Sequence, residues 1–537
     1  MIDNPNQPRK LWLLAIVLLF VIPSCAALDP RFNWIDDAYY IVVAKALATG
    51  QGYTNINLPT PTFHSHFPPG LPVLLSLPML AGLPLGTTIV ICKVLLIALG
   101  ALGLWGLARL MSIEEYPAGL LPWGLVISAV SVAFVSYTCR VASEMLYFPL
   151  SVLALVAVHN YRRTALRSWW LPAAILLLAA LVLTRSIGAL LVAAIVLDLA
   201  WKRDFKRLLL LAVPVGIMLM AWSLGTSGRT PGAGDYTKEF VYMYRSSRAT
   251  SVVPVISGIA GNVWALINIE IPRTIFSIAA SEVVQRHRLL NLMVLPLRLA
   301  VSALALWPIV RGRGGFGLAI RIYLALYFVL MAVWPSDPSR YLVPVGPFFC
   351  FSFVEGVGNL LDGVKSHGGW SFTISPRTVA YLVIGLCIAS NVISDARYVV
   401  TVRRTGDFSP QAAELWDDCM DAYKWIDQNT SPSAVIGCVP PIEAHVYLFT
   451  DRKSVPLPAR VAAWKEPGTS YILQVNDATF YGSVDSRVET RVVNALTSGA
   501  ARPMLTEVYR NRNAIIYEVG QPPPGLPSDI QVARPEN

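Results

Sequence analysis

The sequence predicts an α-helical polytopic membrane protein of about eleven transmembrane helices, with amphipathic loop helices and a small C-terminal α/β soluble domain. The first observation is composition: the 537 residues are 55% hydrophobic and only 14% charged. Soluble globular domains carry about 25% charged residues, so this chain is too apolar for that class. The second observation is a series of long apolar runs up to about residue 400, after which the hydropathy drops.

The spans follow from the lengths of the apolar runs, because a helix needs about 20 apolar residues to cross the hydrocarbon core. We expect them near residues 10–28, 86–109, 117–137, 144–160, 168–184, 186–201, 207–226, 291–310, 316–334, 341–361 and 378–395. The run from Leu71 to Leu85 is too short and too rich in proline for a span. We interpret this run as re-entrant or interfacial. The first apolar run also resembles a signal peptide, but with so many later spans we favour an uncleaved helix.

The orientation follows from lysine and arginine in the short loops, which are enriched on the cytoplasmic side. One set of loops contains Arg9, Lys10, Arg162, Arg163, Arg167, Lys202, Arg203, Lys206, Arg207, Arg311, Arg313, Lys365 and Arg377. The opposite short loops contain Arg140, Arg185 and Arg340, each isolated. The first set is therefore predicted to be cytoplasmic. The long loops 29–85 and 227–290 then face the extracytoplasmic side of a bacterial-type inner (plasma) membrane.

The soluble part is predicted to be an extracytoplasmic α/β domain over residues 401–520. Ser409 and Pro410 begin a helix that ends near Gln428, with serine as cap and proline in the first turn. Short β-type runs follow at Ala434–Cys438, Tyr471–Val475, Met504–Tyr509 and Ala514–Val519, the last two forming a hairpin. Cys419 and Cys438 can form a disulfide if the domain is extracytoplasmic. The proline-rich residues 521–537 are expected to be a disordered tail.

Two adjacent carboxylates, Asp36 and Asp37, open a short amphipathic helix in the first long loop. Acidic residues at a helix start commonly cap free N–H groups and complement the helix dipole. The alternative is catalytic, because adjacent like charges raise the pKa of one carboxyl group and make it a plausible base. Tyr39 on the same helix is a supporting candidate.

Further ionisable side chains recur where the spans meet the same side of the membrane. These are Arg140, Glu144, Arg185, Asp337 and Arg340, with Tyr341 beside them and Lys45 in the first loop. Each alone is as compatible with an interfacial anchor or a structural ion pair as with function. Together they indicate an outward-facing site for an anionic substrate, because ionisable residues at membrane depth are costly.

The first loop also contains His64 and His66, which flank a serine. Alternate side chains of an extended segment point the same way, so the two rings could share a metal ion. Without a clear third ligand, a polar loop feature is the more common explanation. The Pro-Pro-Gly sequence that follows, at 68–70, has a sufficient structural explanation as a rigid return to the membrane.

The chain resembles the GT-C-type polytopic glycosyltransferases, the superfamily of protein O-mannosyltransferases and the lipid A aminoarabinose transferase. The resemblance rests on WIDDAYYIVVAKALATGQGY followed by HFPPGLPVLLSLPMLAG, then Ser-Glu at 143–144, Thr-Arg at 184–185 and Arg-Tyr-Leu-x-Pro at 340–344. It implies that Asp36 is the base acting on the acceptor, whereas the pattern of related oligosaccharyltransferases aligns Asp37. Some members bind a divalent metal, which keeps His64, His66 and Glu144 as possible ligands.

The resemblance also implies a donor sugar carried on polyprenyl phosphate and transferred with inversion to a hydroxyl of a protein, lipid or glycan. Arginine suits the donor phosphate because it donates bidentate, charge-assisted hydrogen bonds. Arg185 and Arg340 are the first candidates, followed by Arg140 and Lys45. The net charge of +10 is assigned to loops facing anionic membrane lipids and not to nucleic-acid binding.

The competing class is a transporter or flippase of a lipid-linked or anionic substrate. That class places charged or helix-breaking residues near the middle of spans and is often built from an inverted repeat. We instead expect the ionisable residues to cluster at one face of the membrane, and the two halves of the sequence show no evident similarity.

Overall fold

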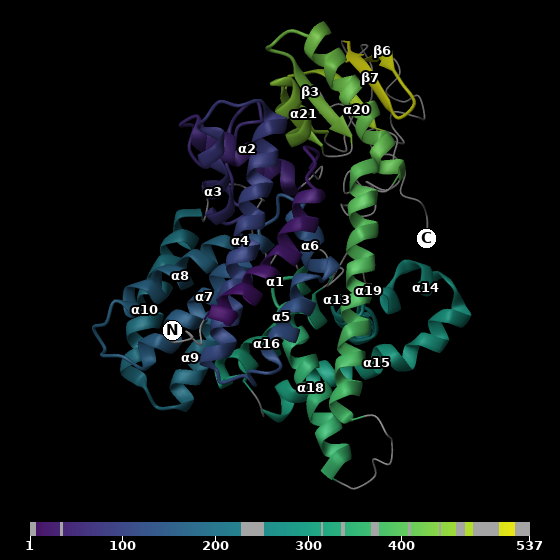
Figure 1. The fold of residues 1–537 in the computed structure, drawn as a ribbon. Helices are drawn as coiled ribbons and strands as arrows, with labels where there is room; N and C mark the ends of the chain where they lie inside the picture. Colours follow the sequence, from purple (N-terminus) through teal and green to yellow (C-terminus); the bar gives the residue numbers. More distant parts are fainter. Residues whose placement is uncertain are drawn as a thin grey trace.

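The computed structural model describes residues 7–32, 36–226, 252–312, 315–334, 339–366, 375–405, 410–439, 442–457, 468–475 and 504–520. The expected tail at 521–537 and Asp337 lie outside these residues. Figure 1 shows a tall helical body that carries a small sheet domain at one end, drawn at the top. We call this end of the molecule the upper end.

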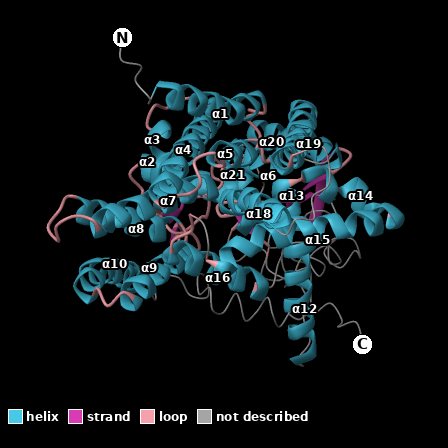
Figure 2. Ribbon diagram, turned by 60° about the horizontal axis from the view of Figure 1, so that its bottom comes forward, coloured by secondary structure: helices cyan, strands magenta, loops and turns pink. Residues whose placement is uncertain are grey.

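The helical body is built from helices that coincide with the predicted spans, singly or as consecutive pairs. They are α1 (Gln7–Ala26), α4 (Leu85–Ile113), α5 (Leu121–Ala129), α6 (Val132–Thr138), α7 (Glu144–Arg162), α8 (Trp170–Thr184), η1 (Ser186–Gly188), α9 (Ala189–Trp201), α10 (Phe205–Thr226), α15 (Arg288–Arg311), α16 (Leu318–Val333), α17 (Ser339–Leu342), α18 (Gly346–Ser366) and α19 (Pro376–Thr405). Figure 2 shows them as a bundle with α10 at its rim.

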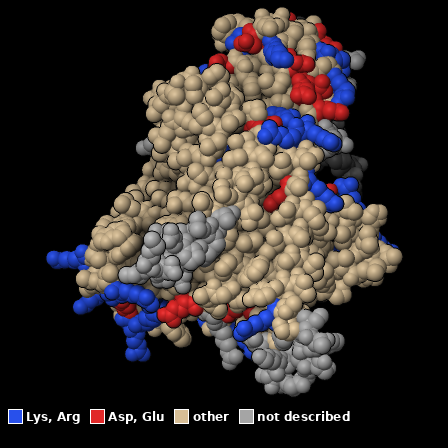
Figure 3. Space-filling model, in the orientation of Figure 1, with Lys and Arg blue, Asp and Glu red and all other residues tan. Residues whose placement is uncertain are grey.

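Within the described residues, 4 helices are long and apolar enough to cross a membrane, namely α4, α10, α15 and α19. The number is 5 if α5 and α6, bent by 51° relative to each other, form one broken span. The chain is thus built as an integral membrane protein, while the count of about eleven crossings stays a prediction. Figure 3 agrees: much of the lower half of the face it shows is uncharged, and charged side chains of both signs lie along its lower edge.

The two long loops are also largely helical. The first contains α2 (Asp36–Ala48), a short antiparallel pair β1 (Thr54–Asn55) and β2 (Thr62–Phe63), and α3 (Gly70–Met79). The described part of the second contains α12 (Val252–Ala265), the π-helix η2 (Leu266–Glu270), α13 (Ile271–Ile275), η3 (Ser277–Ala280) and α14 (Glu282–Arg286). α2 lies at the upper end next to the sheet domain, and α3 packs against α2 (Figure 1).

The C-terminal domain is a mixed α/β unit. It consists of α20 (Pro410–Asn429), β3 (Val435–Val439), α21 (Glu443–Thr450), β4 (Lys453–Pro456), β5 (Thr469–Val475), β6 (Leu505–Arg510) and β7 (Ala514–Val519). The strand order is β4-β3-β5-β7-β6, with β3 parallel to both its neighbours and β7 antiparallel to β5 and β6. The predicted helix and terminal hairpin are confirmed, whereas α21 and β4 were not predicted. The disulfide considered between Cys419 and Cys438 is not formed, because both are free, buried thiols.

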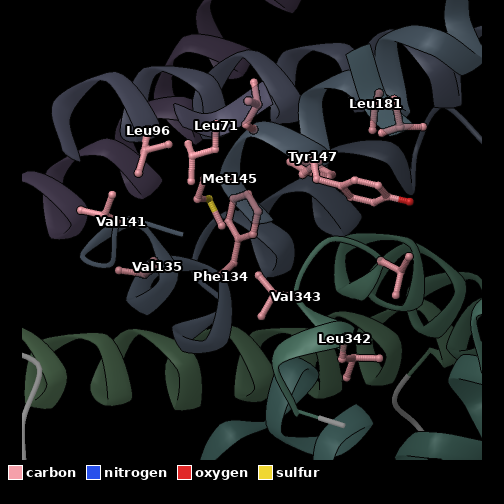
Figure 4. Close-up of a cluster of buried hydrophobic side chains, with 14 of the residues drawn as sticks. Leu71, Leu96, Phe134, Val135, Val141, Met145, Tyr147, Leu181, Leu342 and Val343 are labelled. Carbon is pink, nitrogen blue, oxygen red and sulfur yellow. The ribbon is translucent and has the colours of Figure 1, made fainter. Parts of the chain in front are cut away.

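A continuous apolar core lies below the upper end and holds the site's helices together. Figure 4 shows Leu71, Phe134, Met145, Tyr147 and Leu342 among its members, contributed by loop and bundle elements alike. The helices α4 and α7 pack closely in this region, where a Cβ at Gly103 would collide with the ring of Phe148. Small residues allow such backbone approach between apolar helices.

Candidate active site

The two aspartates at the start of α2 lie in different environments. The Asp37 side chain is buried and its Oδ2 accepts a hydrogen bond of 2.9 Å from the backbone N–H of Val141. The Asp36 side chain keeps 31% of its surface exposed. Consecutive helical residues point about 100° apart, so one carboxylate anchors α2 to the α6–α7 turn and the other is left accessible.

Asp36 belongs to a cluster with Glu144, Arg185 and Arg340, which we call the ion cluster. Arg340 donates from Nη1 to Asp36 and from Nε to Glu144, the second contact measuring 2.5 Å. Arg185 forms an ion pair with the same Oε1 of Glu144. Four predicted site residues, supplied by α2, α7, the α8–η1 junction and α17, therefore meet at one place.

The ion cluster balances two carboxylates against two guanidinium groups. Glu144 is fully buried and Arg185 is 11% exposed, whereas Arg340 is 32% exposed. Burial alone lowers the pKa of Arg340, but Glu144 and Asp36 beside it raise that pKa well above its usual range. Both arginines are therefore permanently charged. Oε2 of Glu144 is buried and has no hydrogen-bond partner, which leaves one buried acceptor unused in the middle of the cluster.

Polar and aromatic side chains support the ion cluster. Arg185 donates a hydrogen bond of 3.0 Å to Oγ of Ser143, and the Tyr40 hydroxyl lies 3.3 Å from the same atom. The guanidinium group of Arg185 lies 5.5 Å from the ring centroid of Tyr341. Ser143 and Tyr40 were not predicted as members of the site, although both stand beside predicted residues in the sequence.

Other predicted residues do not join the ion cluster. Lys45 pairs with Asp451 of the C-terminal domain at 2.6 Å, and it lies about 13 Å along α2 from Asp36 at the helical rise of about 1.5 Å per residue. Arg140 lies over the ring of Tyr137, 4.9 Å from its centroid. The hydroxyl of Tyr39 donates to Oε1 of Glu443, which no sequence pattern indicated.

The histidines considered as metal ligands are arranged differently from that expectation. Nδ1 of His64 lies 2.7 Å from Oδ1 of Asn55, and its Nε2 accepts a hydrogen bond of 3.2 Å from the N–H of Phe67. Burial, with a contribution from His66, lowers the pKa of His64 to about 3, so the ring is neutral. Both ring nitrogens of His64 are thus engaged within the loop.

The donors on the described residues do not fit a metal site. Across the parts of the chain that the structure describes, no group of three or more His, Cys, Asp or Glu side chains could hold a metal ion. The ring of His66 packs edge-on against Phe67, with centroids 4.5 Å apart. We therefore derive no chemical step through a metal ion.

Two buried ionisable residues lie inside helices that we predicted to span the membrane, contrary to our expectation that such residues cluster at one face. Arg298 on α15 and Glu355 on α18 are buried at 1% and 3% exposure, inside helices that we predicted to span the membrane. Nε and Nη1 of Arg298 have no hydrogen-bond partner. Arginine can remain at such depth when it faces the protein interior.

No protein-family model matches the sequence, and no curated protein matches it at the sequence level. Solved structures do match the fold. The archaeal oligosaccharyltransferase AglB from Archaeoglobus fulgidus, in complex with an inhibitory peptide and a dolichol-phosphate, superposes with a TM-score of 0.55 at 13% identity, covering 87% of this chain and 70% of that one. ArnT from Cupriavidus metallidurans, bound to undecaprenyl phosphate, gives 0.54 at 13% identity, covering 99% and 100%.

These similar structures are GT-C glycosyltransferases, an oligosaccharyltransferase and an aminoarabinose transferase. The chain therefore has the GT-C fold, as the resemblance of its loop motifs predicted. At 13% identity, the likeness concerns the fold, and the activity has to be argued from the site.

Proposed function

We propose that the chain is a glycosyltransferase that moves a sugar from a polyprenyl-phosphate donor to an acceptor hydroxyl at the extracytoplasmic face of the membrane. The observation that carries this proposal is the ion cluster, where an accessible carboxylate lies beside two permanently charged arginines, of which Arg185 is largely buried. Transfer of a sugar from a lipid phosphate to a hydroxyl requires a base and a pair of phosphate-binding groups at the same place.

The donor class follows from chemistry and from the relatives in fold. Both were solved with a polyprenol-type phosphate bound, dolichol-phosphate in one and undecaprenyl phosphate in the other. Arg185 and Arg340 are suited to such a phosphate because a guanidinium group has five N–H donors in a planar fork. The contacts to Asp36, Ser143 and Glu144 do not use all of these donors.

The proposed step is a displacement with inversion at the anomeric carbon. Asp36 takes the proton of the acceptor hydroxyl, the acceptor oxygen bonds to the anomeric carbon, and the bond from that carbon to the phosphate oxygen breaks. The electron pair of the broken bond leaves with polyprenyl phosphate, whose charge Arg185 and Arg340 stabilise. A phosphate is a good leaving group, so no strong general acid is needed.

Asp36 is the better candidate for the base than Asp37. Its ion pair with Arg340 uses Oδ2, so Oδ1 remains to take a proton. Asp37 is 3% exposed and accepts the N–H of Val141, which suits an anchor of α2. The acceptor is a hydroxyl of a protein, a lipid or an envelope glycan.

The test is single-turnover sugar transfer from a polyprenyl-phosphate sugar by protein in lipid nanodiscs. We expect Asp36→Asn to lower the rate at least 1,000-fold, about 4 kcal/mol of transition-state stabilisation, with the fold retained. Asp37→Asn should mainly lower the melting temperature, because it weakens a buried anchor. Transfer at wild-type rate by both variants would overturn the proposal, and loss only in Asp37→Asn would move the base to Asp37. Mass spectrometry of envelope material from a deletion strain identifies the sugar and the acceptor.

A second candidate function is transport of a lipid-linked or anionic substrate. Arg298 favours it, since a buried arginine with unpartnered N–H groups inside a predicted span could bind an anion in transit. A flipping assay with a fluorescent polyprenyl phosphate in vesicles separates the two functions. A transporter requires Arg298 and continues to work in Asp36→Asn, whereas the glycosyltransferase shows the reverse dependence.

A further inference from the structure

The C-terminal domain contacts the start of α2 through one buried pair. The Tyr39 hydroxyl donates to Oε1 of Glu443, across 404 residues of sequence. Glu443 is 2% exposed and its Oε2 has no hydrogen-bond partner. Burial raises the pKa of both groups. Tyr39 thus gives this buried carboxyl group a hydrogen-bond donor at Oε1.

Glu443 lies at a special position in its own domain. It is the first residue of α21, the helix that follows the carboxyl end of β3. In the sheet, β3 lies between β4 and β5. The strand order therefore switches direction at β3, since β4 is added on one side of it and β5 on the other. In open α/β sheets, the crevice at this switch in strand order is where ligands bind. Here the hydroxyl of Tyr39 reaches the residue at that position.

A second set of contacts holds the same face of the domain against the first loop. Ser454 at the edge strand β4 donates its backbone N–H to the carbonyl of Asn57 at 2.8 Å. Lys453 donates to the carbonyl of Ile56 at 2.5 Å. An edge strand has free N–H and C=O groups that a neighbouring segment can cover. Together with the Tyr39 contact, this fixes the domain against both α2 and the segment that follows it.

Asp36 lies within reach of this contact. Residues three apart are neighbours on a helix surface, so Tyr39 is adjacent to Asp36 on α2. The first turn of α2 is also held against the bundle, because the carboxylate of Asp37 accepts a hydrogen bond from the backbone N–H of Val141. We propose that Glu443 is a positioning residue of the site, which acts through Tyr39 to hold the first turn of α2 and with it the carboxylate of Asp36.

This inference rests on the proposed function and adds the C-terminal domain to the site. Misplacing a reacting group by about 1 Å can cost 100-fold in rate. We expect Glu443→Ala to lower kcat about 10-fold with KM for the lipid donor unchanged, because Arg185 and Arg340 do not contact Glu443. Glu443→Gln keeps an oxygen that accepts from Tyr39 and should restore kcat to within about 3-fold of the wild type.

Tyr39→Phe is the second variant, since it removes a single oxygen and retains the ring. Its kcat should fall as in Glu443→Ala, and the double variant should be no worse than either single one, the signature of one shared contact. Asp451→Asn is the matched control on the same interface. Its carboxylate is 74% exposed, so its pair with Lys45 is worth little and kcat should not change.

A measurement independent of activity completes the test. We expect amide hydrogen exchange in the first two turns of α2 to be at least 10-fold faster in Glu443→Ala than in the wild type, and unchanged in α4. Unchanged exchange in α2, or wild-type kcat in both Glu443→Ala and Tyr39→Phe, would overturn the inference. Those outcomes leave the proposed function standing if Asp36→Asn is inactive. Wild-type transfer by both Asp36→Asn and Asp37→Asn would contradict the proposed function without touching the exchange result.

Discussion

Glu144 is the residue on which the ion cluster depends most. A single oxygen, Oε1, accepts from Arg340 and pairs with Arg185, while the whole side chain is excluded from solvent. Removing one partner of a buried ion pair leaves an uncompensated charge and costs about 3–5 kcal/mol. The cost is larger than the net worth of the pair itself, because the remaining charge stays desolvated.

We therefore expect Glu144→Gln to lower the free energy of unfolding by about 3 kcal/mol and to weaken sugar transfer as well. Circular dichroism melts in detergent measure the first effect. The control is Glu282→Gln, whose pair with Arg286 is 78–79% exposed and should change stability by less than about 0.5 kcal/mol. Equal melting temperatures for the two variants would show that the ion cluster does not hold the helices together.

His64 makes a pH-dependent contribution to stability. Its folded pKa is about 3, below the value of about 6.5 for an unfolded histidine. The unfolded state therefore binds a proton first as the pH falls, and stability declines by up to about 1.4 kcal/mol per pH unit below about 6.5. We expect melting temperature to fall between pH 6.5 and 5, less steeply in His64→Gln. The exposed His287→Gln should keep the wild-type profile, and an identical slope in His64→Gln would contradict this explanation.

At the residue scale, the acids and arginines could be named from the sequence because charged residues beside apolar spans are rare and conspicuous, and their roles stay a prediction. Asp36, Glu144, Arg185 and Arg340 were all named, and they meet. Glu443 was not named, because its partner Tyr39 is 404 residues away and no local pattern encodes such a contact. Lys45 was assigned by its location in the first loop, but the direction of its side chain depends on where the C-terminal domain docks.

At the scale of elements, α3 and α8 approach each other at Gly70. A Cβ at this position would lie 2.9 Å from the carbonyl oxygen of Leu183 and would also collide with Oγ1 of Thr184. Arg185 of the ion cluster is the next residue after Thr184. The Pro-Pro-Gly turn therefore determines how closely the first loop approaches this arginine.

Gly70→Ala should lower the free energy of unfolding by about 1–3 kcal/mol, the range for overpacking a close contact, and should lower transfer because α8 shifts at Arg185. Thermal melts and the single-turnover assay measure both. The control is Gly119→Ala, where an added Cβ meets nothing within 4 Å and should be neutral. Wild-type behaviour of Gly70→Ala would show that α3 can retreat without disturbing the site.

Helices were easier to predict than their breaks. Apolar length identified each helical segment of the bundle, because a bilayer-crossing run is a strong signal. It did not reveal the 51° bend between α5 and α6, which divides one predicted span. The short elements α21 and β4 were missed because eight or fewer residues give too little periodicity to recognise.

At the scale of the whole molecule, the upper end is assembled from segments that extend from Asp36 to Ser454. The bundle supplies Glu144, Arg185 and Arg340, the first loop supplies Asp36, and the C-terminal domain contacts α2. In this arrangement the arginines are already neutralised by carboxylates. If a lipid phosphate binds there as we propose, we expect it to compete with Asp36 for Arg340 and so to release the carboxylate proposed as the base.

Ligand binding should therefore stabilise the protein in a way that depends on Arg340. A ligand that binds only the folded state adds RT ln(1 + [L]/Kd), about 2.7 kcal/mol at 100 times Kd. We expect undecaprenyl phosphate to raise the melting temperature of the wild type by several degrees, and undecaprenol, which lacks the phosphate, to have little effect. Arg340→Gln should lose the difference between the two lipids. Asp36→Asn should bind the phosphate more tightly than the wild type, because the competing carboxylate is gone. Equal stabilisation by both lipids would mean that the ion cluster does not bind the donor phosphate. Weaker binding of undecaprenyl phosphate by Asp36→Asn would contradict the competition between carboxylate and phosphate for Arg340.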